Sequence, residues 1–215
     1  MIKGWENEER KPLSVRLGEK LHRSPPLKDK IAMSVYRLKA QESRLEDTVR
    51  RLQDHDRDLF SKCVAAQIAK DYPRAAMYAN ECVEIRKMAR ILLQCQLAIE
   101  QVTLRMETIE EFGDVAVMMG PVAGVVRSIK SKIAGVMPEV SYELGQIGES
   151  LNSVVMDVGE ASDQTYNYAT SNDEAQRIIA EASNVAEQRM KEKFPDLPSP
   201  NSLSSEKEFG ARFSI

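Results

Sequence analysis

The stretch that decides the fold runs from Leu27 to Phe112 and is interrupted once: LKDKIAMSVYRLKAQESRLEDTVRRLQDHDRDLFSKCVAAQIAK (27–70), DYP (71–73), RAAMYANECVEIRKMARILLQCQLAIEQVTLRMETIEEF (74–112). Neither long piece contains glycine or proline. In the first, apolar residues recur every seven positions from Ile31 to Ala66, which predicts a long amphipathic helix with a heptad seam. In the second they recur at steps of three and four. Two helices of equal length joined by a short turn predict an antiparallel helical hairpin.

The seam of this hairpin is predicted to be mainly aliphatic. Its principal members are Leu38, Leu45, Leu52, Leu59, Ile85, Leu92 and Ile99. Two seam positions, Glu42 and Asp56, are acidic. A carboxylate is costly in a dry core, so these residues indicate a thin hairpin that stays half open along its length.

Beyond Gly113 the sequence changes character, and shorter helices are predicted over 115–134, 139–157 and from about Ser171 to Lys193. The breaks between and within them are expected at Gly120, Pro121, Gly124, Gly135, Pro138, Gly145, Gly148 and Gly159. Such breaks favour hinges that would let this part of the chain pack on the hairpin or swing away from it. A static set of short helices is the alternative. The chain is thus expected to be all-α, with a helical core over 27–193 (hairpin 27–112, shorter helices 115–193).

Composition and charge exclude several classes of protein. Aromatic residues make up 6% of the chain and charged residues 29%, which disfavours a β-sandwich or barrel. The longest weakly polar run, 115–126, is shorter than a membrane span, and no secretory signal is apparent, so we expect a cytosolic protein. Residues 1–105 carry 21 Lys and Arg against 15 Asp and Glu, whereas residues 106–215 carry 9 against 18. The acidic half could therefore fold back on the basic half or meet that of another copy.

The chemistry of an enzyme is missing from the sequence. His22 and His55 are the only imidazoles, and neither has a nucleophile at a motif spacing. No phosphate-binding loop, dinucleotide fingerprint or zinc-protease motif occurs. Three cysteines, Cys63, Cys82 and Cys95, are spaced unlike a metal site or a disulfide framework. We therefore expect a protein that works by binding, with no catalytic residue, no metal and no cofactor.

Residues 1–26 form a basic leader that ends in Ser24, Pro25 and Pro26. Its candidate membrane-contact residues are Ile2, Trp5, Leu13, Arg16, Leu17, Lys20 and Leu21. The leucines recur every four residues beside cations, which is typical of a short amphipathic helix in the interface of an anionic bilayer. The leucines could equally pack on the core of the protein itself.

Residues 194–215 form a tail too rich in proline and serine to pack by itself. It opens with Phe194, Pro195, Asp196, Leu197, Pro198, Ser199 and Pro200. The prolines favour an extended polyproline-II conformation that presents Leu197 as an apolar anchor. This pattern predicts a docking peptide.

Taken together, the chain resembles the ESCRT-III membrane-remodelling family, and most closely its archaeal cell-division members of the CdvB type. The resemblance covers about residues 10–200. It rests on RAAMYANECVEIRKM (74–88), on IIAEASNVAEQRMKEKFPDLPSP (178–200) and on the change from basic to acidic along the chain. No winged-helix pattern follows the tail, so the chain looks like a shorter paralogue.

The resemblance implies a subunit that polymerises through the hairpin, with itself and with paralogous subunits, on the inner face of the cell membrane at the division site. It further implies that Pro195, Leu197, Pro198 and Pro200 act as an MIT-interacting motif for an AAA+ ATPase that removes subunits. Two alternatives stay open. One is a soluble helical adaptor that never polymerises. The other, a nucleic-acid-binding protein, is disfavoured because acids are interleaved with the bases and no groove-reading element accompanies them.

Overall fold

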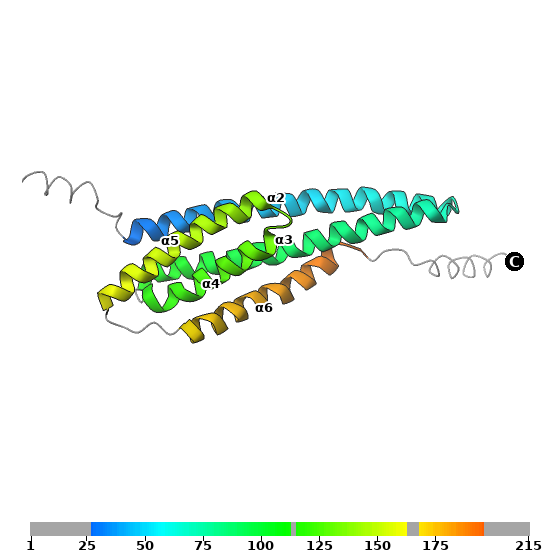
Figure 1. The fold of residues 1–215 in the computed structure, drawn as a ribbon. Helices are drawn as coiled ribbons and strands as arrows, with labels where there is room; N and C mark the ends of the chain where they lie inside the picture. The colour runs from blue at the N-terminus through cyan, green and yellow to red at the C-terminus, as the bar shows by residue number, and fades with distance from the viewer. Residues whose placement is uncertain (1–26, 113–114, 163–167, 196–215) are drawn as a thin grey trace, which may run out of the picture.

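Helices α2 and α3 form the long axis of the molecule. In the computed structural model, which describes residues 27–112, 115–162 and 168–195, α2 spans Leu27–Ile68 and α3 spans Tyr72–Phe112. Helices α4 (Val115–Ile133), α5 (Pro138–Ser162) and α6 (Tyr168–Lys193) follow. Figure 1 shows α2 and α3 running antiparallel as a hairpin whose closed end projects beyond the other three helices. The all-α class and the long hairpin predicted from the sequence are confirmed.

The turn of the hairpin is built by residues that end one helix and start the next. Lys70 adopts a left-handed conformation with φ of 60°, and its N–H bonds to the carbonyl of Gln67 at 2.9 Å. The Asp71 N–H reaches back to the carbonyl of Ala66, which completes a Schellman-type cap of α2. The Asp71 carboxylate then accepts the N–H of Arg74 at 3.2 Å and so caps the first turn of α3. Because α3 begins at Tyr72, Pro73 lies inside the helix, where its ring is compatible with a first turn.

The predicted seam forms the core of the hairpin. Leu38, Leu45, Leu92 and Ile99 are completely buried, Leu59 and Ile85 nearly so, and Leu52 packs partly buried between them. These side chains hold α2 and α3 of one chain together. In this conformation the six buried side chains can contribute to assembly only by stabilising the rod, because they present almost no surface to another molecule.

The shorter helices cover only one half of the hairpin. Helix α5 packs on α2 and α4, while α6 packs on α3 and α4. One large core cluster joins all five helices in this covered half. Toward the turn, two small clusters remain, Leu59 with Cys82 and Ile85, and Cys63 with Ala66 and Ala75. Among the described residues, the closed end of the hairpin is therefore a rod of two helices on which no other helix packs.

The glycines predicted to break α4 and α5 do not do so. Helix α4 continues through Gly120, Pro121 and Gly124, and α5 continues to Ser162 instead of ending near residue 157. A glycine inside a helix costs only about 1 kcal/mol relative to alanine, and packing offsets that cost. A Cβ at Gly124 would lie 3.1 Å from the Cβ of Ala175, and a Cβ at Gly145 would meet the Lys130 side chain at 3.1 Å. These two glycines allow close contact between helices. Helix α6 also starts earlier than predicted, at Tyr168.

Charges join the two halves of the chain within one molecule. On α2, Lys30 pairs with Asp157 at 2.7 Å and Arg37 with Glu143 at 2.9 Å. On α3, Arg90 pairs with Glu187 at 3.2 Å, and Arg105 pairs with Glu174. Each of these four contacts joins a cation of the basic hairpin to an acid on α5 or α6. The acidic half has folded back on the basic half, one of the two arrangements that the charge pattern allowed.

Candidate functional site: the junction of α6 with the hairpin

A buried ion pair connects α2 and α3 near the middle of the hairpin. The Arg86 guanidinium donates through Nε and Nη2 to the two oxygens of the Asp56 carboxylate, at 2.7 and 2.9 Å. Asp56 is only 2% exposed. A buried carboxylate needs such a bidentate partner, because an unpaired charge in this position would be strongly destabilising. The expectation that Asp56 is tolerated because the hairpin stays half open was therefore wrong: the residue is enclosed, and Arg86 neutralises it.

The end of α6 lies against this ion pair. The Phe194 ring, 5% exposed, has its centroid 5.9 Å from the Arg86 guanidinium carbon, within the range of a cation–π contact. The Gln53 side chain donates to the carbonyl of Lys193 at 3.4 Å, and the Phe194 N–H closes the last turn on the carbonyl of Met190 at 2.9 Å. Residues from α2, α3 and the end of α6 thus converge at one point.

This convergence fixes where the tail begins. Phe194 is buried against the hairpin, whereas the adjacent Pro195 is exposed. The candidate docking peptide therefore starts on the surface at the boundary between the covered half of the hairpin and its free end. Arg86 lies in the 74–88 stretch and Phe194 in the 178–200 stretch. The two stretches on which the resemblance rests are in contact in the folded chain.

The surroundings of the junction affect nearby ionisable groups. Burial, together with the Asp56 carboxylate, raises the pKa of the Cys82 thiol to about 11. Burial also raises the pKa of Cys95, further along α3, to about 11. Thiols with such pKa values are not nucleophilic near neutral pH. All three cysteines, Cys63 included, are buried free thiols.

The second acidic seam residue, Glu42, has no buried partner of this kind. It is half-buried. Its pKa is raised mainly by desolvation and, to a smaller extent, by the nearby carboxylates of Glu100 and Glu46. Its neighbour Lys39 instead pairs with Glu107, which raises the pKa of the lysine. The two acidic seam positions therefore differ: Asp56 is neutralised inside the hairpin, whereas Glu42 lies at its edge among like charges.

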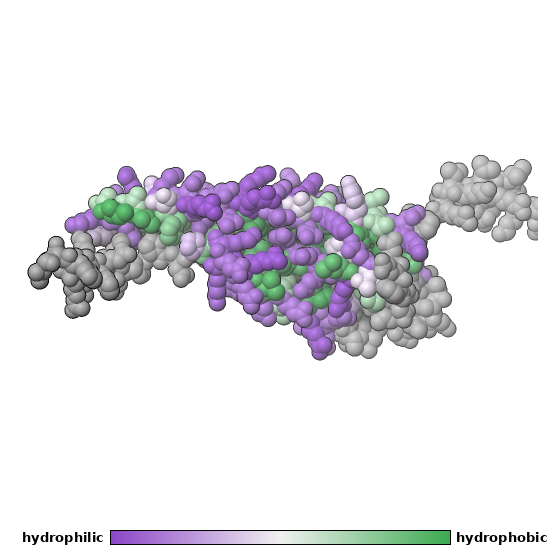
Figure 2. Space-filling view, turned by 180° about the vertical axis from the view of Figure 1, so that it is seen from behind, coloured by the Kyte–Doolittle hydropathy of each residue, from purple (hydrophilic) through white to green (hydrophobic). Residues whose placement is uncertain are grey.

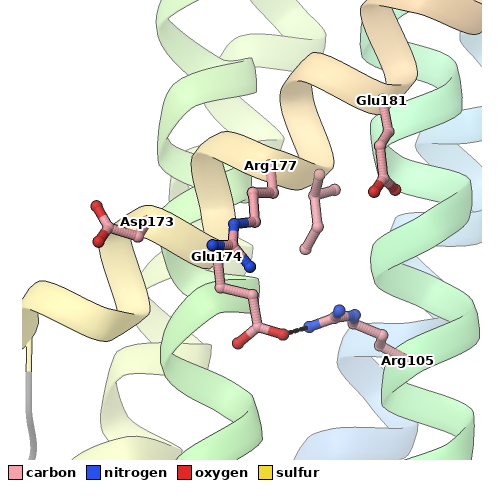
Figure 3. A pocket seen from close by; sticks show the side chains of 6 residues that line it. Arg105, Asp173, Glu174, Arg177 and Glu181 are labelled. Atoms are coloured by element: carbon pink, nitrogen blue, oxygen red, sulfur yellow. Dashed lines mark hydrogen bonds and ion pairs between the residues drawn. The ribbon is translucent and has the colours of Figure 1, made fainter.

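A pocket of about 430 Å³ lies between α3 and the start of α6. Figure 3 shows Arg105 reaching from α3 to Glu174, while Asp173 points away from that pair. Arg177, Glu181 and Ile178 complete the lining. Acids and bases alternate here, so the lining does not select a ligand of one charge. Among the described residues, no group of three His, Cys, Asp or Glu is arranged to hold a metal ion.

Most of the candidate sites predicted from the sequence lie outside the described residues. This applies to the leader residues Ile2, Trp5, Leu13, Arg16, Leu17, Lys20 and Leu21, and to Leu197, Pro198 and Pro200 of the docking peptide. Pro195 is described and exposed. None of the helices in the described ranges combines the length and apolarity needed to cross a membrane.

Sequence reasoning did not identify Arg86 and Phe194 as parts of this junction. The sequence did contain a signal for Arg86, because a buried Asp56 requires a cation on the opposite helix. Three cations, Arg86, Lys87 and Arg90, lie about as far after the turn as Asp56 lies before it. No signal identified Phe194, since an aromatic residue next to a proline-rich tail is equally compatible with exposure. Its partner is determined only by the angle at which α6 lies on α3.

The known proteins that the chain resembles include two cell division proteins of one archaeon. The chain is 47% identical over 182 residues to cell division protein B1 of Sulfolobus acidocaldarius, and the match covers 85% of each chain. It is 37% identical over 166 residues to cell division protein B of the same organism, covering 77% of this chain and 64% of that protein. No protein-family model matches the chain, and no solved structure matches it.

Proposed function

The chain belongs to the family of the Sulfolobus cell division proteins B1 and B, the CdvB type of ESCRT-III protein, and on that premise we propose that it acts in archaeal cell division. Its role is that of a non-enzymatic subunit that forms filaments, with itself and with paralogues, on the inner face of the cell membrane at the division site. The observation that carries the proposal is the 47% identity to a cell division protein over most of both chains.

The form of the hairpin supports assembly. Helix α2 alone, at about 1.5 Å per residue over 42 residues, is about 60 Å long, although one half of it would suffice to complete the core. The uncovered half carries large apolar side chains that are mostly solvent-exposed, among them Ile68, Tyr72 and Met77. A hairpin that is longer than its packed core and carries exposed apolar side chains is typical of a protein that binds other molecules.

Attachment to the membrane is assigned to the leader, with Trp5 and Leu13 among the acyl chains and Arg16 and Lys20 near the phosphates. Each leader binds weakly by itself, and many copies in one filament bind by avidity. Removal from the filament is assigned to an AAA+ ATPase whose MIT domain binds the tail at Pro195, Leu197, Pro198 and Pro200. The start of that peptide on the surface next to Phe194 supports this assignment.

The experiment that tests the proposal is sedimentation of the full chain with and without anionic liposomes, at two salt concentrations. We expect filaments by electron microscopy, and lipid-dependent pelleting that weakens as salt screens the leader cations. The Trp5→Ala variant should pellet less with liposomes than the wild type. A monodisperse protein under every condition would instead identify the soluble adaptor.

The tail is tested separately by binding of the full chain to the MIT domain of the ATPase. Leu197→Asp should abolish this binding and leave filament formation intact. Leu203→Asp, which places the same charge outside the proline-rich stretch, serves as the matched control. Equal binding by Leu197→Asp and the wild type would remove the docking assignment.

A further inference from the structure

Two groups of exposed apolar side chains lie at different ends of the molecule. The first, the tip patch, consists of Ile68, Tyr72 and Met77 around the turn of the hairpin, with exposed fractions of 72%, 65% and 54%. Figure 2 shows hydrophobic atoms gathered at the end of the rod where α2 meets α3. No other helix of the described residues packs on this end. Within residues 27–112, 115–162 and 168–195, the tip patch is therefore not covered by another helix.

The second group, the shoulder patch, lies where α2 and α5 meet in the covered half. It consists of Met33 and Tyr36 on α2 and of Tyr142 and Met156 on α5, each more than half exposed.

Polar contacts between α2 and α5 hold the shoulder patch in place. Arg37 donates to Glu143 at 2.9 Å and to Gln146 at 3.3 Å, and Gln146 donates to the Tyr142 hydroxyl at 2.8 Å. Next to Met156, Asp157 pairs with Lys30 at 2.7 Å. The charged groups that these apolar side chains flank are already paired, so burying the patch would not deprive those charges of their partners.

The exposed charges that lack an ion-pair partner differ in balance between the two patches. Near the tip patch, two cations and one acid, Lys62, Lys70 and Glu81, form no ion pair in the part of the chain that the structure describes. Asp29 and Glu149 lie next to the shoulder patch and likewise have no ion-pair partner among the described residues. Complementary charge of this kind favours one orientation of approach and opposes contact of like patches.

From these features we propose that the tip patch of one copy binds the shoulder patch of a second copy. The inference rests on the proposed filament function and names the contact through which copies join. A contact between two different surfaces of the same chain is heterologous, so each copy keeps a free tip or shoulder and the assembly stays open-ended. Along α2, Tyr36 and Ile68 are about 50 Å apart at about 1.5 Å per residue, which sets the approximate axial repeat.

The distribution of the helices favours a second copy as the partner. The shorter helices thicken only the half of the rod that carries the shoulder patch, as Figure 1 shows, and leave the tip narrow. With a narrow apolar end and a broad apolar face on one molecule, the end of each copy can bind the side of the next. Both patches remain exposed in the folded-back arrangement of α4 to α6, so the contact does not require those helices to move.

The first test uses variants of the full chain that each remove one side of the contact. Ile68→Glu removes the tip and Tyr36→Glu removes the shoulder, and both side chains are exposed, so the helical content by circular dichroism should not change. Each variant should raise the critical concentration for filament formation about tenfold or more, because an apolar side chain is replaced by a charge. Val185→Glu on α6 is the matched control and should leave the critical concentration unchanged.

Mixing the two variants distinguishes a heterologous contact from a symmetric one. Ile68→Glu retains a shoulder and Tyr36→Glu retains a tip, so an equimolar mixture should give a dimer by analytical ultracentrifugation and no longer species. A dimer of Tyr36→Glu alone would show that tips bind tips, which overturns the proposal. Growth of the mixture into filaments would overturn it as well.

Cross-linking provides a readout that does not depend on assembly strength. The chain carrying both Tyr72→Cys and Tyr36→Cys should form a disulfide-linked ladder upon mild oxidation, whereas Tyr72→Cys with Val185→Cys should not. The native cysteines are buried and do not interfere. If the wild type forms filaments and the Ile68→Glu and Tyr36→Glu variants form them equally well, this contact is refuted while the proposed function still stands. Failure of the wild type to form filaments, with or without liposomes, would refute the proposed function itself.

Discussion

Replacing Arg86 by methionine should destabilise the protein by about 3–5 kcal/mol, the usual cost of leaving a buried charge without its partner. The side chain of Asp56 is 3% exposed and that of Arg86 15%, so water cannot take the place of the two charged hydrogen bonds. Methionine keeps the aliphatic part of the Arg86 side chain but lacks the guanidinium that lies over the Phe194 ring. Because a cation–π contact contributes only about 0.5–2 kcal/mol, the loss should come mainly from the unpaired Asp56 carboxylate.

The measurement is the free energy of unfolding from urea titrations followed by far-UV circular dichroism. Arg50→Met is the matched control, because Arg50 pairs with Glu46 and Asp47 on the surface and its side chain is 64% exposed. Exposed pairs contribute about 0–1 kcal/mol. The double variant Asp56→Leu with Arg86→Met removes both charges and should recover most of the loss, because apolar replacements of buried pairs are often neutral or stabilising.

Two results would refute this reasoning. If Arg86→Met costs no more than Arg50→Met, the Asp56 carboxylate is hydrated in solution and the hairpin is open at its centre. If the double variant is as unstable as Arg86→Met alone, the cost arises from lost packing against Phe194 and not from an unpaired charge.

Three further predictions concern other parts of the molecule. Gly124→Leu should separate α6 from α4, because even a Cβ would lie 3.1 Å from that of Ala175; we expect a loss of about 1–3 kcal/mol and faster amide hydrogen exchange in α6. Glu42→Gln should stabilise the protein at pH 7. Because the pKa of Glu42 is raised in the folded state, its charged form costs stability as the pH rises above the ordinary value of 4.5, so the two proteins should converge in urea titrations below that pH. Cys82 and Cys95, with pKa values of about 11, should resist alkylation by iodoacetamide at pH 8 in the folded protein and react once it is unfolded.

Much of the hairpin was predictable because its signals are local. The uninterrupted heptads from Ile31 to Ala66 require a helix with one apolar face, and the matching stretch after Pro73 supplies its partner. The turn was placed within a residue or two. The charge pattern predicted that the acidic part could fold back, yet it did not indicate which cations would meet which acids.

The glycines of α4 and α5 show where local reasoning failed. A glycine reads in a sequence as a break, whereas at Gly124 and Gly145 the structure uses the missing side chain to bring a neighbouring helix or a lysine stem close. That contact exists only after α4 has packed on α5 and α6, so no local pattern contains it. The same holds for Phe194, which is buried or exposed depending on where α6 ends along α3.

The sequence by itself determined the helices, the pairing of the first two and the separation of charge along the chain, because each depends on the periodicity or composition of a continuous segment. Only the tertiary structure decided that Asp56 is enclosed with Arg86, that the tail starts at their junction, and that no other described helix covers the apolar side chains at the tip and the shoulder. These features depend on the positions of residues far apart in the chain. Those positions follow from the angles at which whole helices pack.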